Sequence, residues 1–403
     1  MNDQKMDNNN PPVAPSGPER ITLTVAAADD GYEVEFAATA QPLIVDWGDG
    51  SAAETYTNVT VQLDDSFRYL DPISHTYAGS GAYTVQIKGE GLTCFSCRQA
   101  TVTALDVGKC TALQELNCCE NQLTALDVSK CTALQKLNCG SNPLTALDVN
   151  KCTALQELDC YGNQLTALDV SKCTALQTLK CGGNQQLTAL DVSKCLALQW
   201  LECEWNPLTS LDVSKCTALQ WLECDNNQLT ALDVGKCTAL RTLKCDGNQL
   251  TALDISKCPA LEWLECDGNE LTALDVSKCT ALEMLRCRNN KLTSLDVSKC
   301  TALQTLGCDY NQLTSLNVGK CEALQRLDCC DNQLTFLDVS KCTALQLLNC
   351  GINQLSATAL HTVFTALPLR SDPCGYLIIQ NNPGAATCDK ALAENKGWRF
   401  AKS

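Results

Sequence analysis

Hydrophobic positions recur along most of this chain with a fixed period of 21 residues. Between Leu92 and Leu355 each unit carries Leu and Cys at alternate positions, then an Asn, then three further apolar residues. In one clear copy Leu158 and Cys160 flank Asp159. This alternation predicts a short β-strand with Leu158 and Cys160 facing inward and Asp159 facing outward. Since a single unit cannot bury its apolar face alone, the units are expected to stack into a solenoid.

The second half of each unit predicts a turn and a return path. Asn163 follows the strand, and its amide is expected to bond to neighbouring backbone inside the stack. Leu165, Leu168 and Val170 fill the core from the other side. The period lengthens once, to 22 residues at Gln185–Gln186, where the extra residue falls in a turn. The pattern L-x-x-L-x-C-x-x-N-x-L is that of leucine-rich repeats with Cys in place of the last strand Leu, and it predicts a β-rich solenoid of about 14 parallel strands.

Cysteines form two columns in this repeat and account for 25 of the 30 cysteines in the chain. Neighbouring strands lie about 4.8 Å apart, whereas a disulfide needs Cβ atoms about 3.8 Å apart. A uniform column is therefore expected to stay reduced and to act as a ladder of small buried hydrophobes. Zinc or iron–sulfur ligation is the alternative reading. The first column comprises Cys97, Cys118, Cys139, Cys160, Cys181, Cys203, Cys224, Cys245, Cys266, Cys287, Cys308, Cys329 and Cys350, and the second Cys110, Cys131, Cys152, Cys173, Cys195, Cys216, Cys237, Cys258, Cys279, Cys300, Cys321 and Cys342.

Five cysteines lie outside the two columns. Cys94, Cys119 and Cys330 fall at outward strand positions, so we expect exposed thiols there. Cys374 and Cys388 lie near the C-terminus. A disulfide between these two is one reading, and a buried Cys374 is the other, because Cys374 aligns with a core Leu of the repeat.

Both ends of the solenoid depart from the consensus, as terminal repeats do. In the first unit Phe95 replaces Leu and Ala100 replaces Asn. At the other end residues 357–367 have helical spacing that stops before Pro368. Residues 377–379 then predict a last strand, and we assign residues 357–403 to a C-terminal capping region and residues 91–356 to the solenoid.

Residues 20–90 have a different pattern. Strand-like alternation appears in residues 21–25 and 32–36, followed by the sequence V-D-W-G-D-G at 45–50 and by H-T-Y…G-A-Y-T-V-Q-I within 75–87. This segment resembles the PKD-type β-sandwich, which carries a W-G-D-G turn and an H-x-Y…G-x-Y-x-V strand pair. The resemblance implies a small spacer domain.

Three polar residues of this segment have two readings each. Asp46 and Asp49 either cap their turn through bonds to backbone N–H groups or hold a cation, and capping is the more common role. We interpret His75 as a packed or hydrogen-bonded residue rather than a ligand. Residues 1–19 are polar, rich in Asn, Asp and Pro, and predict a disordered tether.

The repeat as a whole resembles the cysteine-containing 21-residue repeats of internalin-J-like surface proteins, which are common in Bacteroidetes. The resemblance covers roughly residues 92–400 and implies a surface or secreted adhesion protein, either a lipoprotein or an exported protein with its signal removed. A monomer is expected.

Composition narrows the range of functions. The formal net charge is −16 and the pI about 4.6, which opposes binding to nucleic acid and to anionic membranes. The sequence has no apolar run of about 18 residues that would predict a transmembrane helix. It has two histidines and none of the common phosphate-binding, nucleophile-elbow or zinc-protease motifs. We therefore expect no enzyme activity, no cofactor and no metal.

The outward strand positions supply the candidate binding site. Tryptophans share one column on the predicted sheet, acidic residues share the next two, and exposed aromatics ringed by charge are typical of binding sites. Sequence drift within the array is the alternative reading. The open sheet is expected to leave these carboxylates solvated, with ordinary pKa values. The predicted partner is a host or neighbouring-cell protein, with a glycan, or a spacer role without ligand, as alternatives. The candidate residues are Trp200, Glu202, Glu204, Trp205, Trp221, Glu223, Asp225, Asp246, Trp263, Glu265, Asp267 and Met284.

Overall fold

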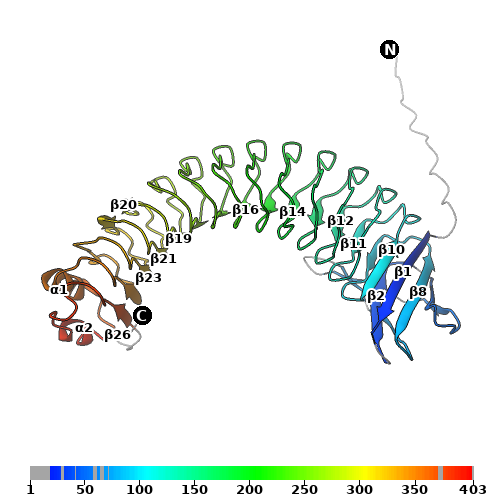
Figure 1. The fold of residues 1–403 in the computed structure, drawn as a ribbon, viewed down its shortest axis with the longest axis horizontal. Coiled ribbons are helices and arrows are strands. Elements are labelled where there is room, and N and C mark those ends of the chain that lie inside the picture. Colours follow the sequence, from blue (N-terminus) through cyan, green and yellow to red (C-terminus); the bar gives the residue numbers. More distant parts are fainter. Residues whose placement is uncertain are drawn as a thin grey trace, which may run out of the picture.

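The computed structural model shows an arch of stacked coils with short strands along its inner side (Figure 1). It describes residues 19–28, 31–40, 42–57, 61–63, 68–70, 72–370 and 375–401. Residues 1–18 of the predicted tether lie outside the described residues. Cys374 does too, so the two predictions made for it concern a residue that the structure does not describe.

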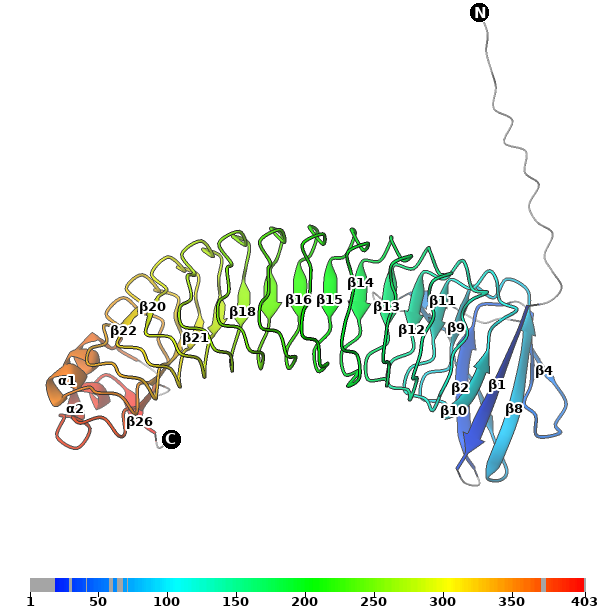
Figure 2. The same ribbon diagram turned by 45° about the horizontal axis from the view of Figure 1, so that its top comes forward.

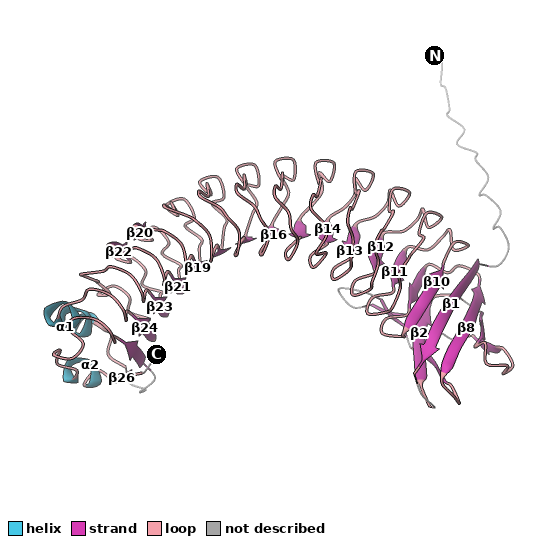
Figure 3. Ribbon diagram, viewed as in Figure 1, coloured by secondary structure: helices cyan, strands magenta, loops and turns pink. Residues whose placement is uncertain are grey.

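The inner strands form one parallel ladder in chain order, with Phe95 opposite Leu116 at the first step and Leu opposite Leu from Leu116 to Leu348. This arrangement confirms the predicted solenoid with its repeat length (Figure 3). The ladder comprises β9 (Cys94–Ser96), β11 (Glu115–Asn117), β12 (Lys136–Asn138), β13 (Glu157–Asp159), β14 (Thr178–Lys180), β15 (Trp200–Glu202), β16 (Trp221–Glu223), β17 (Thr242–Lys244), β18 (Trp263–Glu265), β19 (Met284–Arg286), β21 (Thr305–Gly307), β23 (Arg326–Asp328) and β24 (Leu347–Asn349).

A second, shorter pairing lies on the other side of the coils. Strands β20 (Ser294–Asp296) and β22 (Ser315–Asn317) pair in parallel, and Figure 2 shows them on the outer side of the arch. The inner side carries a strand in every coil whereas the outer side is mostly turns. The inner face of the arch is therefore the concave one and the outer face is convex.

A buried asparagine joins each coil to the previous one. Asn163 Nδ2 donates to the carbonyl oxygens of Cys160 (3.0 Å) and Cys139 (3.1 Å), and Asn163 Oδ1 accepts from the backbone N–H of Leu144 (3.1 Å). Equivalent bonds recur along the solenoid as far as Asn382. The amide satisfies buried backbone groups that the turn leaves without partners, which confirms the predicted role of Asn163.

The extra residue at Gln185–Gln186 lies in a turn, as predicted. Asn206 Oδ1 accepts from the backbone N–H of Asn184 (2.9 Å), instead of from the leucine that follows the insertion. Asn206 Nδ2 still reaches the carbonyl oxygen of Cys181 (3.1 Å). The insertion therefore changes one hydrogen bond and leaves the stacking intact.

Both cysteine columns are buried, and every cysteine of the described residues is a free thiol. In the second column each thiol from Cys131 onward bonds to a carbonyl of the previous coil, as Cys173 does to Val149 (3.7 Å). Burial raises the pKa of the Cys152 thiol to about 12. The structure corrects the exposure predicted for Cys94 and Cys119, which are buried, whereas Cys330 is partly exposed.

Cys94 is buried for a reason that the repeat pattern does not contain. Cys94 packs against Ala37 of strand β2 (Glu33–Ala38), which pairs antiparallel with β9. The N-terminal strands thus cover the first inner strand of the solenoid, and an outward position there is no longer a surface position.

The N-terminal segment forms two sheets that continue into the solenoid. One sheet has the order β10-β1-β8-β3-β4, and the other pairs β7 with β2 and β2 with β9. Since β9 and β10 belong to the first repeat, the two parts share one hydrophobic core without a linker. The remaining strands are β1 (Glu19–Ala27), β3 (Leu43–Asp46), β4 (Glu54–Tyr56), β5 (Val61–Leu63), β6 (Arg68–Leu70), β7 (Ile73–Thr76), β8 (Gly81–Gly89) and β10 (Val102–Asp106).

The acidic turn of the N-terminal segment is capped by its own side chains. Asp46 accepts from the N–H of Gly48 (3.1 Å), and Asp49 from that of Ser51 (2.9 Å). His75 lies 2.9 Å from Asp49 Oδ2 and stacks on Trp47. This geometry favours the capping reading of the two aspartates and confirms the packed, hydrogen-bonded His75.

The C-terminal region closes the other end of the solenoid. Helix α1 (Ala357–Ala366) begins at Ser356, whose hydroxyl accepts from the N–H of Ala359, and it stops before Pro368 as predicted. Strands β25 (Gly375–Ile378) and β26 (Trp398–Phe400) extend the inner ladder, with α2 (Ala391–Glu394) between them. Among the described residues, no helix is long and apolar enough to cross a membrane.

Candidate functional site

Trp200 and Trp221 form a closed stack on the concave face. Their rings lie 4.2 Å apart, centroid to centroid, with 5° between the planes. The Lys180 ammonium lies 5.7 Å from the centroid of the Trp200 ring, and the Lys244 ammonium 5.2 Å from that of Trp221. Each indole thus has one face against the other indole and a cation close to it. Little of either ring face is left for a sugar or a partner side chain.

The glutamates of the neighbouring column are ion-paired within the sheet. Each reaches a cation on an adjacent strand, and Trp200 Nε1 also donates to Glu202 (2.6 Å). These ion pairs neutralise much of the negative charge that the sequence places at the site. The pairs are Glu202 with Lys180 (3.2 Å), Glu223 with Lys244 (3.1 Å) and Glu265 with Arg286 (3.2 Å).

Two tryptophans of the predicted site are open to solvent. Trp263 is 40% exposed and Trp205 is 59% exposed. Trp205 has a positive φ of 55°, a conformation that bulky residues rarely adopt. Met284, which pairs in register with Trp263, is partly exposed. These three side chains form the accessible apolar part of the predicted ribbon.

The acidic column beyond the cysteines is a hydrogen-bonded ladder. Asp225 Oδ1 accepts from the N–H of Asp246 (2.8 Å), and Asp246 Oδ1 from that of Asp267 (2.6 Å). Burial, followed by the charge of the next carboxylate, raises the pKa of Asp225 to about 8 and that of Asp246 to about 7. The expectation of solvated carboxylates with ordinary pKa values is therefore wrong, and Glu204 and Asp225 are buried. The physical reason is that each side chain folds back along the sheet toward a neighbouring coil.

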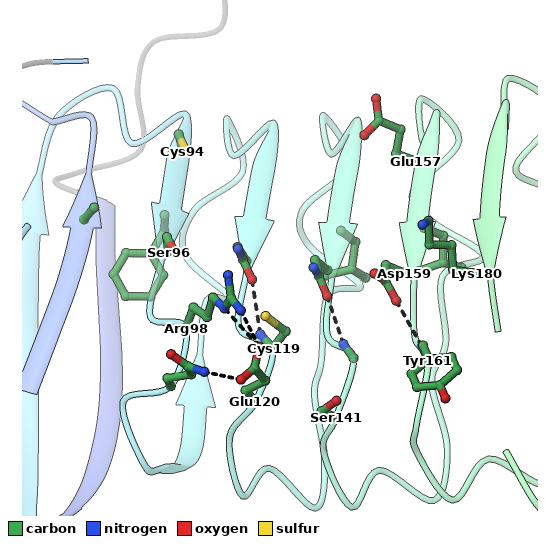
Figure 4. A pocket seen from close by; sticks show the side chains of 18 of the residues that line it. Cys94, Ser96, Arg98, Cys119, Glu120, Ser141, Glu157, Asp159, Tyr161 and Lys180 are labelled. Carbon is green, nitrogen blue, oxygen red and sulfur yellow. Dashed lines mark hydrogen bonds and ion pairs between the residues drawn. The ribbon is translucent and has the colours of Figure 1, made fainter. Parts of the chain in front are cut away.

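A groove of about 930 Å³ occupies the concave face at the N-terminal end of the arch. Its lining runs from Phe36 of β2, across β9 and the first coils, to Glu202 and Glu204. Figure 4 shows the part from Cys94 to Lys180. Sequence reasoning found its two last residues but not the groove itself. The wall contributed by β2 depends on how the N-terminal sheets pack on the solenoid, and no repeat pattern contains that information.

The groove lining is acidic. Six carboxylates and two cations, Arg98 and Lys180, line it. Figure 4 shows Arg98 turned toward Glu120 of the next coil, to which it is ion-paired at 2.6 Å. Lys180 is likewise engaged by Glu202. The remaining charge of the groove is therefore negative, which suits a cationic ligand.

Glu204 fills space that a glycine leaves open. A Cβ at Gly182 would lie 2.4 Å from Glu204 Oε1, so only glycine allows the carboxylate to fold over this coil. Glu204 Oε2 is buried without a hydrogen-bond partner. Burial raises the pKa of Glu204 to about 7, with the charges of Glu223 and Glu202 adding to the effect. The residue that follows the strand cysteine is acidic in several units, as at Glu204 and Asp225, but it is a glycine at Gly182. This glycine was the signal in the sequence for the site.

One further group of ligand-type side chains lies near the C-terminal end of the concave face. Oxygen and sulfur atoms of Asp309, Asp328 and Cys330 lie within 4.8 Å of one another. Arg288 forms an ion pair with Asp309 at 2.9 Å. This cation neutralises the group in part, and the arrangement serves as a local ion-pair network.

Comparison with known proteins places the solenoid among leucine-rich-repeat structures. A family model described as Leucine Rich repeats (2 copies) matches residues 111–152 and 153–195. The functional domain of InlJ from Listeria monocytogenes, which includes a cysteine ladder, is 31% identical, with 71% of this chain and 73% of that chain covered and a TM-score of 0.54. No curated protein matches the chain in sequence.

Two other solved structures share the fold at lower identity. The internalin InlF from Listeria monocytogenes is 23% identical, with 78% of this chain and 87% of that chain covered and a TM-score of 0.60. The Arabidopsis receptor kinase HAESA, solved with a peptide hormone and a co-receptor, is 18% identical, with 78% and 58% covered and a TM-score of 0.63. These two similarities concern the fold alone.

Proposed function

The chain belongs to the internalin-type leucine-rich-repeat proteins with a cysteine ladder, and we propose that it is a non-enzymatic protein that binds a protein partner on its concave face. The observation that carries this proposal is the concave surface itself. It combines exposed Trp205 and Trp263 with a continuous array of charged side chains and an acidic groove. Aromatic anchors surrounded by charge are common at protein–protein interfaces.

The geometry favours a protein over a glycan. Sugar recognition uses an open aromatic face, and the stack of Trp200 on Trp221 has little open face to offer. Trp205 and Trp263 keep exposed ring surface, so a glycan remains the second candidate. A purely structural spacer role is the third, and the experiment below separates all three.

The finer features of the proposal come from the family resemblance. We place the protein at a cell surface or outside the cell, exported and anchored there, with a host or neighbouring cell as the source of the partner. Residues 20–90 serve as a PKD-like spacer. Because that spacer shares its core with the first repeat, it holds the solenoid in a fixed direction rather than on a flexible hinge.

The test is a binding screen of the purified protein against a panel of extracellular and cell-surface proteins and against a glycan array. The variant Trp205→Ala/Trp263→Ala removes the two exposed tryptophans of the candidate site. The control Phe336→Ala removes an exposed aromatic on the outer side of the arch. Phe336 occupies the same repeat position as Ser315 of the outer strand β22. We expect a protein hit that the double variant loses and the Phe336 variant keeps.

The salt dependence of a hit discriminates the ligand classes. A charge-assisted protein contact weakens as salt rises from 0.05 to 0.5 M, whereas sugar stacking is little affected. A glycan hit that survives salt supports the second candidate. Absence of any hit, or a protein hit that both variants keep, contradicts recognition by the concave aromatics.

A further inference from the structure

At one end of the groove the Glu204 carboxylate and the Tyr161 ring lie against the same pair of glycines. A Cβ at Gly182 would lie 2.4 Å from Glu204 Oε1, and a Cβ at Gly183 would lie 3.5 Å from Tyr161 Cζ. The two glycines leave a floor without side chains between an acid and an aromatic ring. Figure 4 shows Tyr161 and Lys180 on neighbouring coils here.

Glu204 has no cation of its own. The residue is 8% exposed, and its Oε2 atom has no hydrogen-bond partner. Lys180, the cation whose charge acts on Glu204, is already paired with Glu202. A buried carboxylate without a partner is costly, and a bound cation is one way to offset that cost.

Tyr161 supplies the second half of the recognition. Its side chain is 42% exposed although it lines the groove. An aromatic face attracts a cation placed over it. A guanidinium is planar, stacks on aromatic rings and donates paired N–H groups to carboxylates, whereas a lysine ammonium does not stack in this way. The combination of a flat ring and an unpaired carboxylate therefore fits arginine best.

We propose that the Tyr161–Glu204 pocket binds the guanidinium of an arginine side chain presented by the protein partner. This inference rests on the proposed function, and it names the chemistry of one contact. The acidic lining, with six carboxylates against two cations, draws a basic segment of the partner into the groove. Arginine enters the pocket as Glu204 ionises.

The probe is the blocked peptide acetyl-Gly-Arg-Gly-amide, with the same peptide carrying neutral citrulline as its control. The full chain is labelled with 3-fluorotyrosine, and the Tyr161 resonance is assigned by Tyr161→Phe. We expect the arginine peptide to shift this resonance with a Kd on the order of 1 mM, and the citrulline peptide to leave it unchanged. Glu204→Gln weakens binding about tenfold, whereas the matched control Glu322→Gln, at an exposed position outside the groove lining, binds as the parent does.

The pH dependence of the same titration tests the carboxylate directly. Since the ionised form binds and the pKa of Glu204 is raised to about 7, the fraction of ionised Glu204 rises about tenfold between pH 6 and pH 8, and binding tightens accordingly. Lys180, Glu202 and Glu223 are the charged groups that act on Glu204. The Glu204→Gln variant loses the dependence.

Two results overturn the pocket. One is an unchanged Tyr161 resonance with the arginine peptide, and the other is an equal shift with citrulline. If Glu204→Gln does not fold, the variant Tyr161→Ala replaces it, because Tyr161 is exposed. Binding of the peptide to this variant is then measured by saturation-transfer NMR on the peptide signals. Binding as strong as that of the parent protein also refutes the proposal. A protein partner that binds the concave face while both peptides fail would leave the proposed function standing and remove only the arginine contact.

Discussion

Trp200 and Trp221 stack face to face across strands β15 and β16, with their ring centroids 4.2 Å apart. The sequence placed both rings on the surface as ligand contacts. The structure pairs them with each other and with Lys180 and Lys244. Their first role is therefore cohesion of the sheet, and recognition falls to the neighbouring open side chains.

The stack is expected to stabilise the fold measurably. A double-mutant cycle with Trp200→Ala and Trp221→Ala should give a coupling free energy of about 0.5–1.5 kcal/mol, the usual value for aromatic pairs. Chemical denaturation monitored by circular dichroism measures it. Trp200 and Trp263 are separated by strands β16 and β17 and serve as the control pair. A coupling as small as that of the control pair would show that the stack adds nothing.

The asparagine ladder is the most sensitive polar element of the solenoid. Asn227 Nδ2 donates to the carbonyls of Cys203 and Cys224, and Asn227 Oδ1 accepts from the N–H of Leu208. Asn227→Ala leaves these buried groups without partners and should lower the free energy of unfolding by about 2–4 kcal/mol. Gln228→Ala, an exposed neighbour, should change it by less than about 0.5 kcal/mol. Equal effects of the two variants would contradict the ladder.

The cysteines of the two columns should not react with alkylating reagents in the folded protein. Burial raises the pKa of these thiols, to about 12 for Cys152, and alkylation needs the thiolate. Among the described cysteines we expect iodoacetamide at pH 8 to modify the partly exposed Cys388 first. Cys330 is also partly exposed but should react slowly, because burial raises its pKa to about 12. All 30 cysteines should react in denaturant. Intact-mass and peptide analysis counts the adducts, and rapid alkylation of column cysteines in the folded state would argue against their burial.

Stability should fall as the pH rises from 5 to 8. The pKa of Asp225 is about 8 in the fold against 3.8 as its ordinary value. A carboxyl with a raised pKa stabilises the fold fully below its unfolded pKa, and this contribution is lost as the pH rises through the folded pKa. Asp246 and Glu204 act in the same direction, with pKa values of about 7. Turn aspartates such as Asp169 have lowered pKa values, so they change the pH dependence of the stability only below pH 4.

The variant Asp225→Asn isolates this effect, because its amide oxygen still accepts from the N–H of Asp246. It should raise stability at pH 8 by on the order of 1 kcal/mol and leave stability at pH 5 nearly unchanged. Melting temperatures at the two pH values measure the difference. A parent protein more stable at pH 8 than at pH 5 would show that the column does not hold buried carboxylates.

The repeat pattern predicted the solenoid because every coil repeats one set of local rules. Alternation placed Leu158 and Cys160 inside, and the asparagine ladder followed from one turn residue. The same reasoning failed where distant segments meet. Burial of Cys94 depends on strand β2, some sixty residues earlier in the chain, and the groove depends on the same packing.

Side-chain direction was the second source of error. The pattern assigns Glu204 and Asp225 to the surface, since it specifies which way a Cα–Cβ bond points and not where a longer side chain ends. Both fold back along the sheet, Glu204 over Gly182 and Asp225 to the backbone of Asp246. Burial of their carboxylates, and hence their raised pKa values, follows from that step.

Binding on the concave face is tested most directly by hydroxyl-radical footprinting of the protein with and without the partner found in the screen. We expect protection of Trp205, Trp263 and Tyr161 in the complex and unchanged oxidation of Phe336 on the outer side. Protection of Phe336 with unchanged oxidation of the three concave residues would contradict it.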